Sequence, residues 1–128
     1  VGNVNIEQLI DFHRNSGSMV TLTAVRPPAR FGALDFDSQG KVREFREKPS
    51  VGSGWINGGF FVVKPAALNL VRGDDVSWED EPLATLAKRN QLSAFKHTGF
   101  WQPMDTLREK LFLNELWDSG KAPWKIWD

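Results

Sequence analysis

The stretch Val42–Val63, VREFREKPSVGSGWINGGFFVV, is the most informative part of this sequence for the fold. A charged segment runs into Glu47-Lys48-Pro49, a Gly/Ser loop follows, and an apolar segment is entered through Asn57-Gly58-Gly59. The carboxylate of Glu47 can accept hydrogen bonds from hydroxyls, and the adjacent ammonium of Lys48 suits a phosphate. Two glycines leave room for another group to come close. The same residues also fit an exposed strand end with a solvated ion pair and a turn, so both interpretations stay open.

The elements expected around this stretch follow from hydrophobic periodicity, β-branched residues, and cap and turn residues. Helices are expected at 5–17, 65–71, 77–90 and 106–120, and strands at 20–25, 31–36, 42–47, 56–63 and 92–96. In the helix at 77–90, Pro82 limits where the regular part begins. The strands at 31–36 and 42–47 are predicted to form a hairpin, because the residues between them favour a turn. This order of elements predicts an α/β fold.

Three further predictions concern packing. The continuous apolar run at 56–63 is typical of a central strand covered on both faces. The strand–helix–strand order predicts that 56–63 and 92–96 pair in parallel through a right-handed crossover. The spacing in the last helix predicts a buried stripe of Leu107, Leu111, Leu116 and Trp117.

Composition excludes several functional classes. A chain of 128 residues can form one domain with a single core. Its 16 Lys and Arg balance 16 Asp and Glu, so neither nucleic acid nor an anionic membrane is expected as a partner. There is no cysteine, which excludes disulfides and thiolate chemistry. With no membrane-length apolar run and no recognisable leader, we expect a cytoplasmic protein.

The second informative stretch is Gly99–Thr106, GFWQPMDT, between the last strand and the last helix, where open α/β sheets bind ligands. An Asp directly before a helix is often its N-cap, but Thr106 and Glu109 already form a Thr-x-x-Glu capping box. The Asp105 carboxylate therefore fits either a cap or a ligand for a hard cation such as Mg²⁺. Trp101 fits either a platform for a sugar face or a core residue.

Other candidate chemistry is weaker. His13 and His97 have no suitably spaced metal partners and no Ser or Cys to activate, so we expect both to be structural or exposed. The chain also contains no glycine-rich loop that could cradle phosphates in the usual way. A nucleoside triphosphate is therefore not expected to be held by such a loop within this sequence.

Short segments spread along the chain match a known family in order: RFGAL (30–34), EKP (47–49), INGGFF (56–61), WE and EPL (78–83), FWQPMDT (100–106) and GKAPWK (120–125). Together they resemble the C-terminal half of the glucose-1-phosphate cytidylyltransferase family, a branch of the sugar nucleotidyltransferases. The Glu-Lys-Pro motif is shared by sugar nucleotidyltransferases generally, whereas the Trp-Gln-Pro-Met-Asp-Thr form points to the cytidylyl branch.

The resemblance implies the C-terminal portion of a Rossmann-like nucleotidyltransferase fold, a mixed sheet with flanking helices. It also implies cytidylyl transfer from CTP to glucose 1-phosphate, giving CDP-glucose and pyrophosphate for deoxysugar and lipopolysaccharide biosynthesis. Lys48 would hold the glucose phosphate as the catalytic residue, Glu47 would accept hydrogen bonds from glucose hydroxyls, and Asp105 would bind Mg²⁺. The full sugar-binding set would be Gly32, Glu47, Lys48, Asn57, Gly58 and Trp101.

The resemblance also predicts what this chain lacks. The family's nucleotide loop, basic catalytic residue and first metal-binding aspartate would lie upstream of Val1. Residues 1–128 are therefore expected to form one domain, the sugar-binding half without the nucleotide-binding half, inactive on CTP alone and self-associating as a homo-oligomer. Two alternatives stay open: a non-catalytic sugar-phosphate-binding or regulatory module, and a structural oligomerisation domain that uses the tryptophan-rich tail.

Overall fold

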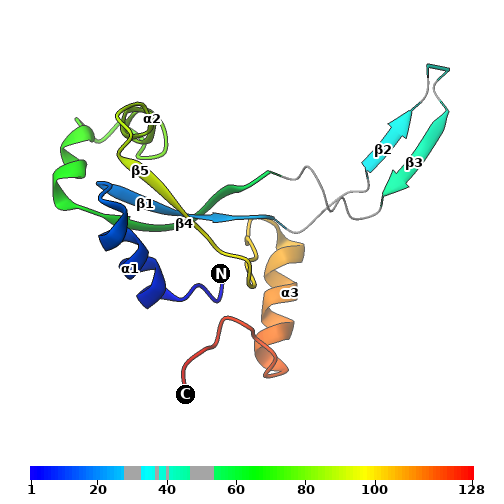
Figure 1. Ribbon diagram of the computed structural model, residues 1–128. Coiled ribbons are helices and arrows are strands. Elements are labelled where there is room, and N and C mark those ends of the chain that lie inside the picture. The colour runs from blue at the N-terminus through cyan, green and yellow to red at the C-terminus, as the bar shows by residue number, and fades with distance from the viewer. Residues whose placement is uncertain (28–32, 37, 40, 47–53) are drawn as a thin grey trace.

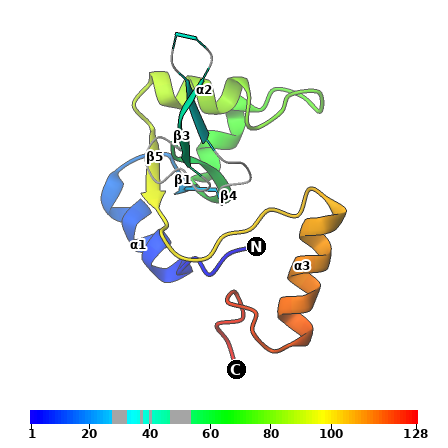
Figure 2. The same cartoon turned by 90° about the vertical axis from the view of Figure 1, so that its right-hand side faces the viewer.

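The computed structural model describes residues 1–27, 33–36, 38–39, 41–46 and 54–128, and Figures 1 and 2 show it in two views. Its elements agree with the expected ones to within the usual uncertainty of their ends, except at the start of α2. In chain order they are α1 (Ile6–Ser16), β1 (Val20–Val25), β2 (Ala33–Phe36), β3 (Val42–Arg46), β4 (Ile56–Val63), the 3-10 helix η1 (Pro65–Leu70), α2 (Glu81–Lys88), β5 (Leu92–Lys96) and α3 (Leu107–Asp118).

A mixed three-stranded sheet in the order β4-β1-β5 is the centre of the fold. β1 pairs with β4 antiparallel and with β5 parallel. Within the described residues β4 is thus an edge strand that does not pair with β5, and both of our predictions about it were wrong. The expected hairpin is confirmed in its described part, since β2 and β3 pair antiparallel; Phe31, Gly32 and Glu47 lie outside the described residues.

The path between β4 and β5 explains these two errors. Val63 and Leu92 both lie opposite Val20, so the chain leaves β4 and enters β5 at the same end of the sheet. The segment containing η1 and α2 therefore does not carry the chain back along the strands, as a parallel crossover requires. β1 takes the central position instead: five of its six residues are buried, whereas most of β4 is only partly buried.

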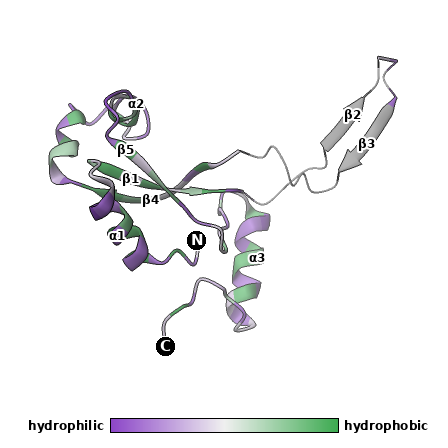
Figure 3. Ribbon diagram, viewed as in Figure 1, coloured by the Kyte–Doolittle hydropathy of each residue, from purple (hydrophilic) through white to green (hydrophobic). Residues whose placement is uncertain are grey.

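Helices cover both faces of this sheet. On one face Val20 packs with Ala67, Leu83 and Leu86 from η1 and α2. On the other face α1 contributes buried Leu9 and His13. Figure 3 shows hydrophobic residues along β1 and β4 between these helices. Burial of this apolar surface on two faces is the main stabilising contribution to the fold.

Local signals fix the helix ends. The side chain of Asn5 accepts a hydrogen bond from the Gln8 amide at 3.0 Å, and Gly17 ends α1 with φ of 71°. α2 begins at Glu81 instead of Ser77, because Pro82 is tolerated only in the first turn of a helix. No helix among the described residues is long and apolar enough to cross a membrane.

The predicted buried stripe of α3 was wrong. Leu107, Leu111 and Trp117 are 69%, 58% and 50% exposed, Leu116 is half-buried, and Leu113 is the buried residue of the helix. Apolar spacing shows that residues share one face of a helix, but it does not show that another element covers that face. Among the described residues the face of α3 that carries Leu107 and Leu111 is left largely uncovered.

Candidate functional site

Four of the seven predicted site residues lie in the described part of the chain: Asn57 and Gly58 in β4, and Trp101 and Asp105 in the segment before α3. Gly32, Glu47 and Lys48 lie outside the described residues, so their roles stay predictions. The four site residues that the structure describes form two groups, one around Gly58 and Trp101 and one at the start of α3.

A direct hydrogen bond joins the two informative stretches of the sequence. The Trp101 Nε1–H donates to the Gly58 carbonyl oxygen at 3.1 Å, across 43 residues of sequence. Backbone pairing holds this position from the other side: Gly2 and Trp101 form an antiparallel bridge, and the Asn3 amide donates to the Phe100 carbonyl at 3.1 Å. Figure 2 shows the segment before α3 running beside the N-terminus. The indole of Trp101 is thus fixed against β4.

Close packing against β1 explains why residue 58 is a glycine, independently of any ligand. A Cβ at this position would lie 2.8 Å from Val25 Cγ1 and 3.1 Å from the Thr23 carbonyl oxygen. Next to it, the Asn57 side-chain oxygen accepts a hydrogen bond from the Gly59 amide at 2.9 Å, and Gly59 has φ of 86°. The register of β1 and β4 shifts here, so this part of the site is an irregular strand that only glycines allow.

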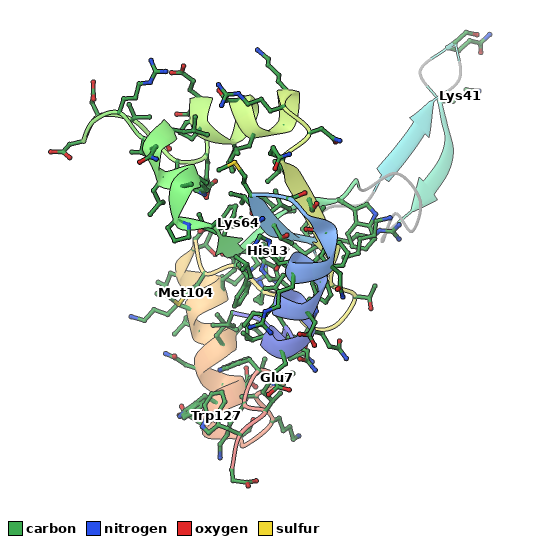
Figure 4. The ribbon with its side chains drawn as sticks, turned by 60° about the vertical axis from the view of Figure 1, so that its left-hand side comes forward. Glu7, His13, Lys41, Lys64, Met104 and Trp127 are labelled. Carbon is green, nitrogen blue, oxygen red and sulfur yellow. The ribbon has the colours of Figure 1, made fainter. Side chains whose placement is uncertain are left out.

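The start of α3 leaves the Asp105 carboxylate out of the helix cap. The Glu109 amide donates to Thr106 Oγ1 at 3.2 Å, and a Glu109 carboxylate oxygen accepts from the Thr106 and Asp105 amides at 3.0 and 2.7 Å. This confirms the predicted capping box. Asp105 is exposed, as is the neighbouring Met104, which Figure 4 shows at the same end of the helix.

Asp105 supplies one hard oxygen ligand of the kind that Mg²⁺ prefers. The described ranges contain no group of three or more His, Cys, Asp or Glu side chains that could hold a metal ion. Within that part of the chain Asp105 does not belong to a three-ligand cluster, so a cation bound there would need further ligands.

The two histidines are structural, as expected. His13 is buried on α1 with its Nδ1 2.8 Å from Thr21 Oγ1. Burial lowers the pKa of His13, and the nearby positive charge of Lys64 lowers it further; Figure 4 shows the two residues near each other. His97 Nε2 lies 3.0 Å from the Phe100 carbonyl oxygen, so it helps to hold the backbone next to Trp101.

Sequence reasoning missed two aromatic clusters. Arg26 and Lys96 lie over the ring of Trp55, with the Arg26 Cζ 4.6 Å and the Lys96 Nζ 5.5 Å from the ring centroid. Strand register brings these three residues together, and no sequence pattern indicates it. The second cluster is a stack of Phe100, Trp124 and Trp117. The tail drew attention because it is rich in tryptophan, but its sequence did not indicate that Trp124 stacks on Phe100.

Comparison with known proteins identifies the family. The family model described as nucleotidyl transferase matches residues 1–105. The chain belongs to the nucleotidyl transferase family. It is 54% identical over 128 residues to glucose-1-phosphate cytidylyltransferase of Salmonella typhi, and this alignment covers 100% of the chain and 49% of that protein. The chain thus spans about half the length of this relative.

More distant nucleotidyl transferases differ in the substrates that their names state. The mannose-1-phosphate guanylyltransferase catalytic subunit beta of Drosophila pseudoobscura pseudoobscura is 34% identical over 113 residues, covering 86% of this chain and 30% of that protein. A solved Bacillus anthracis structure described as a glucose-1-phosphate thymidylyltransferase superposes with a TM-score of 0.62 at 16% identity, covering 100% of this chain and 52% of that one. This likeness confirms the expected α/β nucleotidyltransferase fold.

Proposed function

We propose that this chain forms the sugar-phosphate side of a glucose-1-phosphate cytidylyltransferase, which converts CTP and glucose 1-phosphate to CDP-glucose and pyrophosphate. The observation that carries the proposal is the 54% identity over 128 residues to the Salmonella typhi enzyme of that name. Identity to the guanylyltransferase relative is 34%, so the cytidylyl branch is favoured. The proposed ligands of this chain are therefore glucose 1-phosphate and the nucleotide sugar CDP-glucose.

The proposed reaction is a displacement at phosphorus. A phosphate oxygen of glucose 1-phosphate attacks the α-phosphate of CTP, the new P–O bond forms, and pyrophosphate leaves with the electron pair of the broken bond. Such reactions depend mainly on in-line positioning and on stabilisation of negative charge. Lys48 would hold the attacking phosphate, while Glu47 would bind glucose hydroxyls and Trp101 would form a wall of the sugar site. The Trp101–Gly58 hydrogen bond supports this arrangement, because it fixes the indole beside β4.

We propose Asp105 as a Mg²⁺ ligand, since its carboxylate is exposed and takes no part in the helix cap. When bound, the ion would neutralise phosphate charge. Self-association is also proposed. The outer edge of β4 has no strand partner among the described residues, and exposed strand edges and apolar helix faces favour contact with a second copy of the chain.

Isothermal titration calorimetry with CDP-glucose, with and without Mg²⁺, tests the proposed function. We expect saturable binding that is strengthened by Mg²⁺, is weakened at least about tenfold by Lys48→Ala, and loses its Mg²⁺ dependence in Asp105→Asn. Lys88→Ala, an exposed lysine at the end of α2, is the matched control and should bind normally. Normal binding by Lys48→Ala, or no binding by the folded unaltered chain, would contradict the proposal.

A further inference from the structure

The aromatic stack formed by Phe100, Trp124 and Trp117 connects the C-terminal tail to the candidate site. The rings of Phe100 and Trp124 are stacked with centroids 5.7 Å apart and an interplanar angle of 28°. Trp124 also stacks on Trp117 of α3, at 6.5 Å and 18°. Both distances lie in the attractive range for offset aromatic pairs. One tail residue therefore contacts both the segment before α3 and α3 itself.

Phe100 belongs to the most constrained part of the candidate site. Its carbonyl oxygen accepts from the Asn3 amide and lies 3.0 Å from His97 Nε2. The next residue is Trp101, whose indole N–H donates to the Gly58 carbonyl. A shift of the Phe100 backbone would therefore shift the Trp101 indole as well.

Within the described residues, little of the apolar surface of α3 is buried. Leu113 is its buried residue, and Leu107 and Leu111 are largely exposed. Since Asp105 and Thr106 begin this helix, the position of the Asp105 carboxylate depends on where α3 lies. The stack fixes the C-terminal end of α3, because Trp117 of that helix packs on Trp124 of the tail and Trp124 packs on Phe100.

The tail itself is ordered by local turns, so Trp124 can act as a fixed contact. Gly120 has φ of 70° and its amide donates to the Trp117 carbonyl at 3.0 Å, which turns the chain back along α3. The amides of Lys125 and Ile126 donate to the carbonyls of Ala122 and Trp124 at 3.1 and 3.0 Å. Figures 1 and 2 show the tail turning back after α3.

We propose that Trp124 is a positioning residue: its ring joins Phe100 to α3, and thereby holds the Trp101 indole against β4 and the Asp105 carboxylate at the start of α3. The proposal rests on the proposed function for the ligand roles of Trp101 and Asp105. Its structural part, the coupling of the tail to the Trp101 hydrogen bond, stands independently of those roles. Trp124 acts on the Trp101 indole through Phe100, and on the start of α3 through Trp117.

Hydrogen exchange of the Trp101 indole N–H, followed by NMR, tests the coupling directly. In Trp124→Ala we expect this proton to exchange about fivefold faster or more, as for loss of the net stabilisation of one hydrogen bond. Trp124→Phe keeps a stacking ring and should restore slow exchange. Trp127→Ala removes an exposed tail tryptophan, 56% accessible, and should leave exchange unchanged. Phe100→Leu breaks the stack from the other side and provides a second test if Trp124→Ala does not fold.

Calorimetric titration of the same variants with CDP-glucose and Mg²⁺ tests the consequence for the ligand. We expect about tenfold weaker binding for Trp124→Ala and near-normal binding for Trp124→Phe and Trp127→Ala. Unchanged indole exchange in folded Trp124→Ala or Phe100→Leu would overturn the positioning role. Absence of CDP-glucose binding by the unaltered chain would instead overturn the proposed function, while the exchange measurement would still decide the coupling.

Discussion

Replacement of Gly58 by alanine is predicted to destabilise the fold through a defined clash. The new Cβ would lie 2.8 and 3.1 Å from the two methyl carbons of Val25 and 3.1 Å from the Thr23 carbonyl oxygen. Favourable carbon–carbon contacts lie near 3.5–4.0 Å, so both contacts with Val25 are too close. The contact with the Thr23 carbonyl oxygen is also tighter than an ordinary van der Waals contact. Val25 is 1% exposed on the central strand and cannot move aside without disturbing β4 or β5.

The magnitude follows from two opposing effects. Overpacking of a well-packed core costs about 1–3 kcal/mol. Alanine offsets about 0.5–1 kcal/mol of this by reducing the conformational freedom of the unfolded chain. Because the contact with Val25 Cγ1 is shorter than 3.0 Å, the cost should lie in the upper part of the overpacking range. We therefore expect Gly58→Ala to lower the free energy of unfolding by about 1–2 kcal/mol, and to weaken the Trp101 hydrogen bond to the Gly58 carbonyl.

Urea unfolding followed by circular dichroism measures this change. With a slope of about 2 kcal/mol per molar urea, the midpoint should fall by about 0.5–1 M at unchanged slope. Gly54→Ala is the matched control, because its Cβ would meet no atom of the described residues within 4 Å, and it should be neutral within about 0.5 kcal/mol. In a Val25→Ala background, Gly58→Ala should cost about 1 kcal/mol less. Equal costs in both backgrounds, or a neutral Gly58→Ala, would refute the packing argument.

Three other predictions concern pH, the core and assembly. In the folded chain the pKa of His13 is lowered from 6.5, so the unfolded chain binds a proton there more readily. The free energy of unfolding should therefore fall as the pH drops below about 6.5. If His13→Gln left this pH dependence unaltered, the prediction would be contradicted. Leu86→Ala should lower the free energy of unfolding by about 2–5 kcal/mol, whereas Leu111→Ala, at a position 58% exposed, should change it by less than about 0.5 kcal/mol; similar values in urea titrations would show that the core is misassigned. Size-exclusion chromatography with light scattering should detect self-association, and a monomer at all concentrations would count against it.

Most of the fold could be predicted from local signals in the sequence. Caps such as Asn5 and Thr106 marked helix starts, and Pro82 explains why α2 begins late. Strand order could not be predicted in the same way. The apolar run at 56–63 looked central, yet β1 occupies the centre, because the position of a strand depends on contacts between distant segments such as Val20 with Val63 and Leu92. Hydrophobicity alone does not distinguish these arrangements.

The candidate site was partly predictable. The Gly99–Thr106 stretch pointed to Asp105 and Trp101, and the capping box that leaves the Asp105 carboxylate out of the cap is present. The hydrogen bond from Trp101 to Gly58 could not be foreseen, since it joins residues far apart in sequence. The stacking of Trp124 on Phe100 is likewise set by tertiary structure, and the tryptophan-rich tail had suggested only a possible role in oligomerisation.

Saturation-transfer difference NMR of CDP-glucose with this chain and Mg²⁺ tests the proposed function without any variant. The proposed contacts of Glu47, Lys48 and Trp101 are with glucose and its phosphate, so saturation should be strongest at the glucose ring protons and should be lost when glucose 1-phosphate is added. GDP-mannose, which differs in both sugar and base, should receive much less saturation. Glucose signals from CDP-glucose that disappear with glucose 1-phosphate are the predicted result. Equal saturation of GDP-mannose, or none of CDP-glucose by the folded chain, would contradict the proposed function.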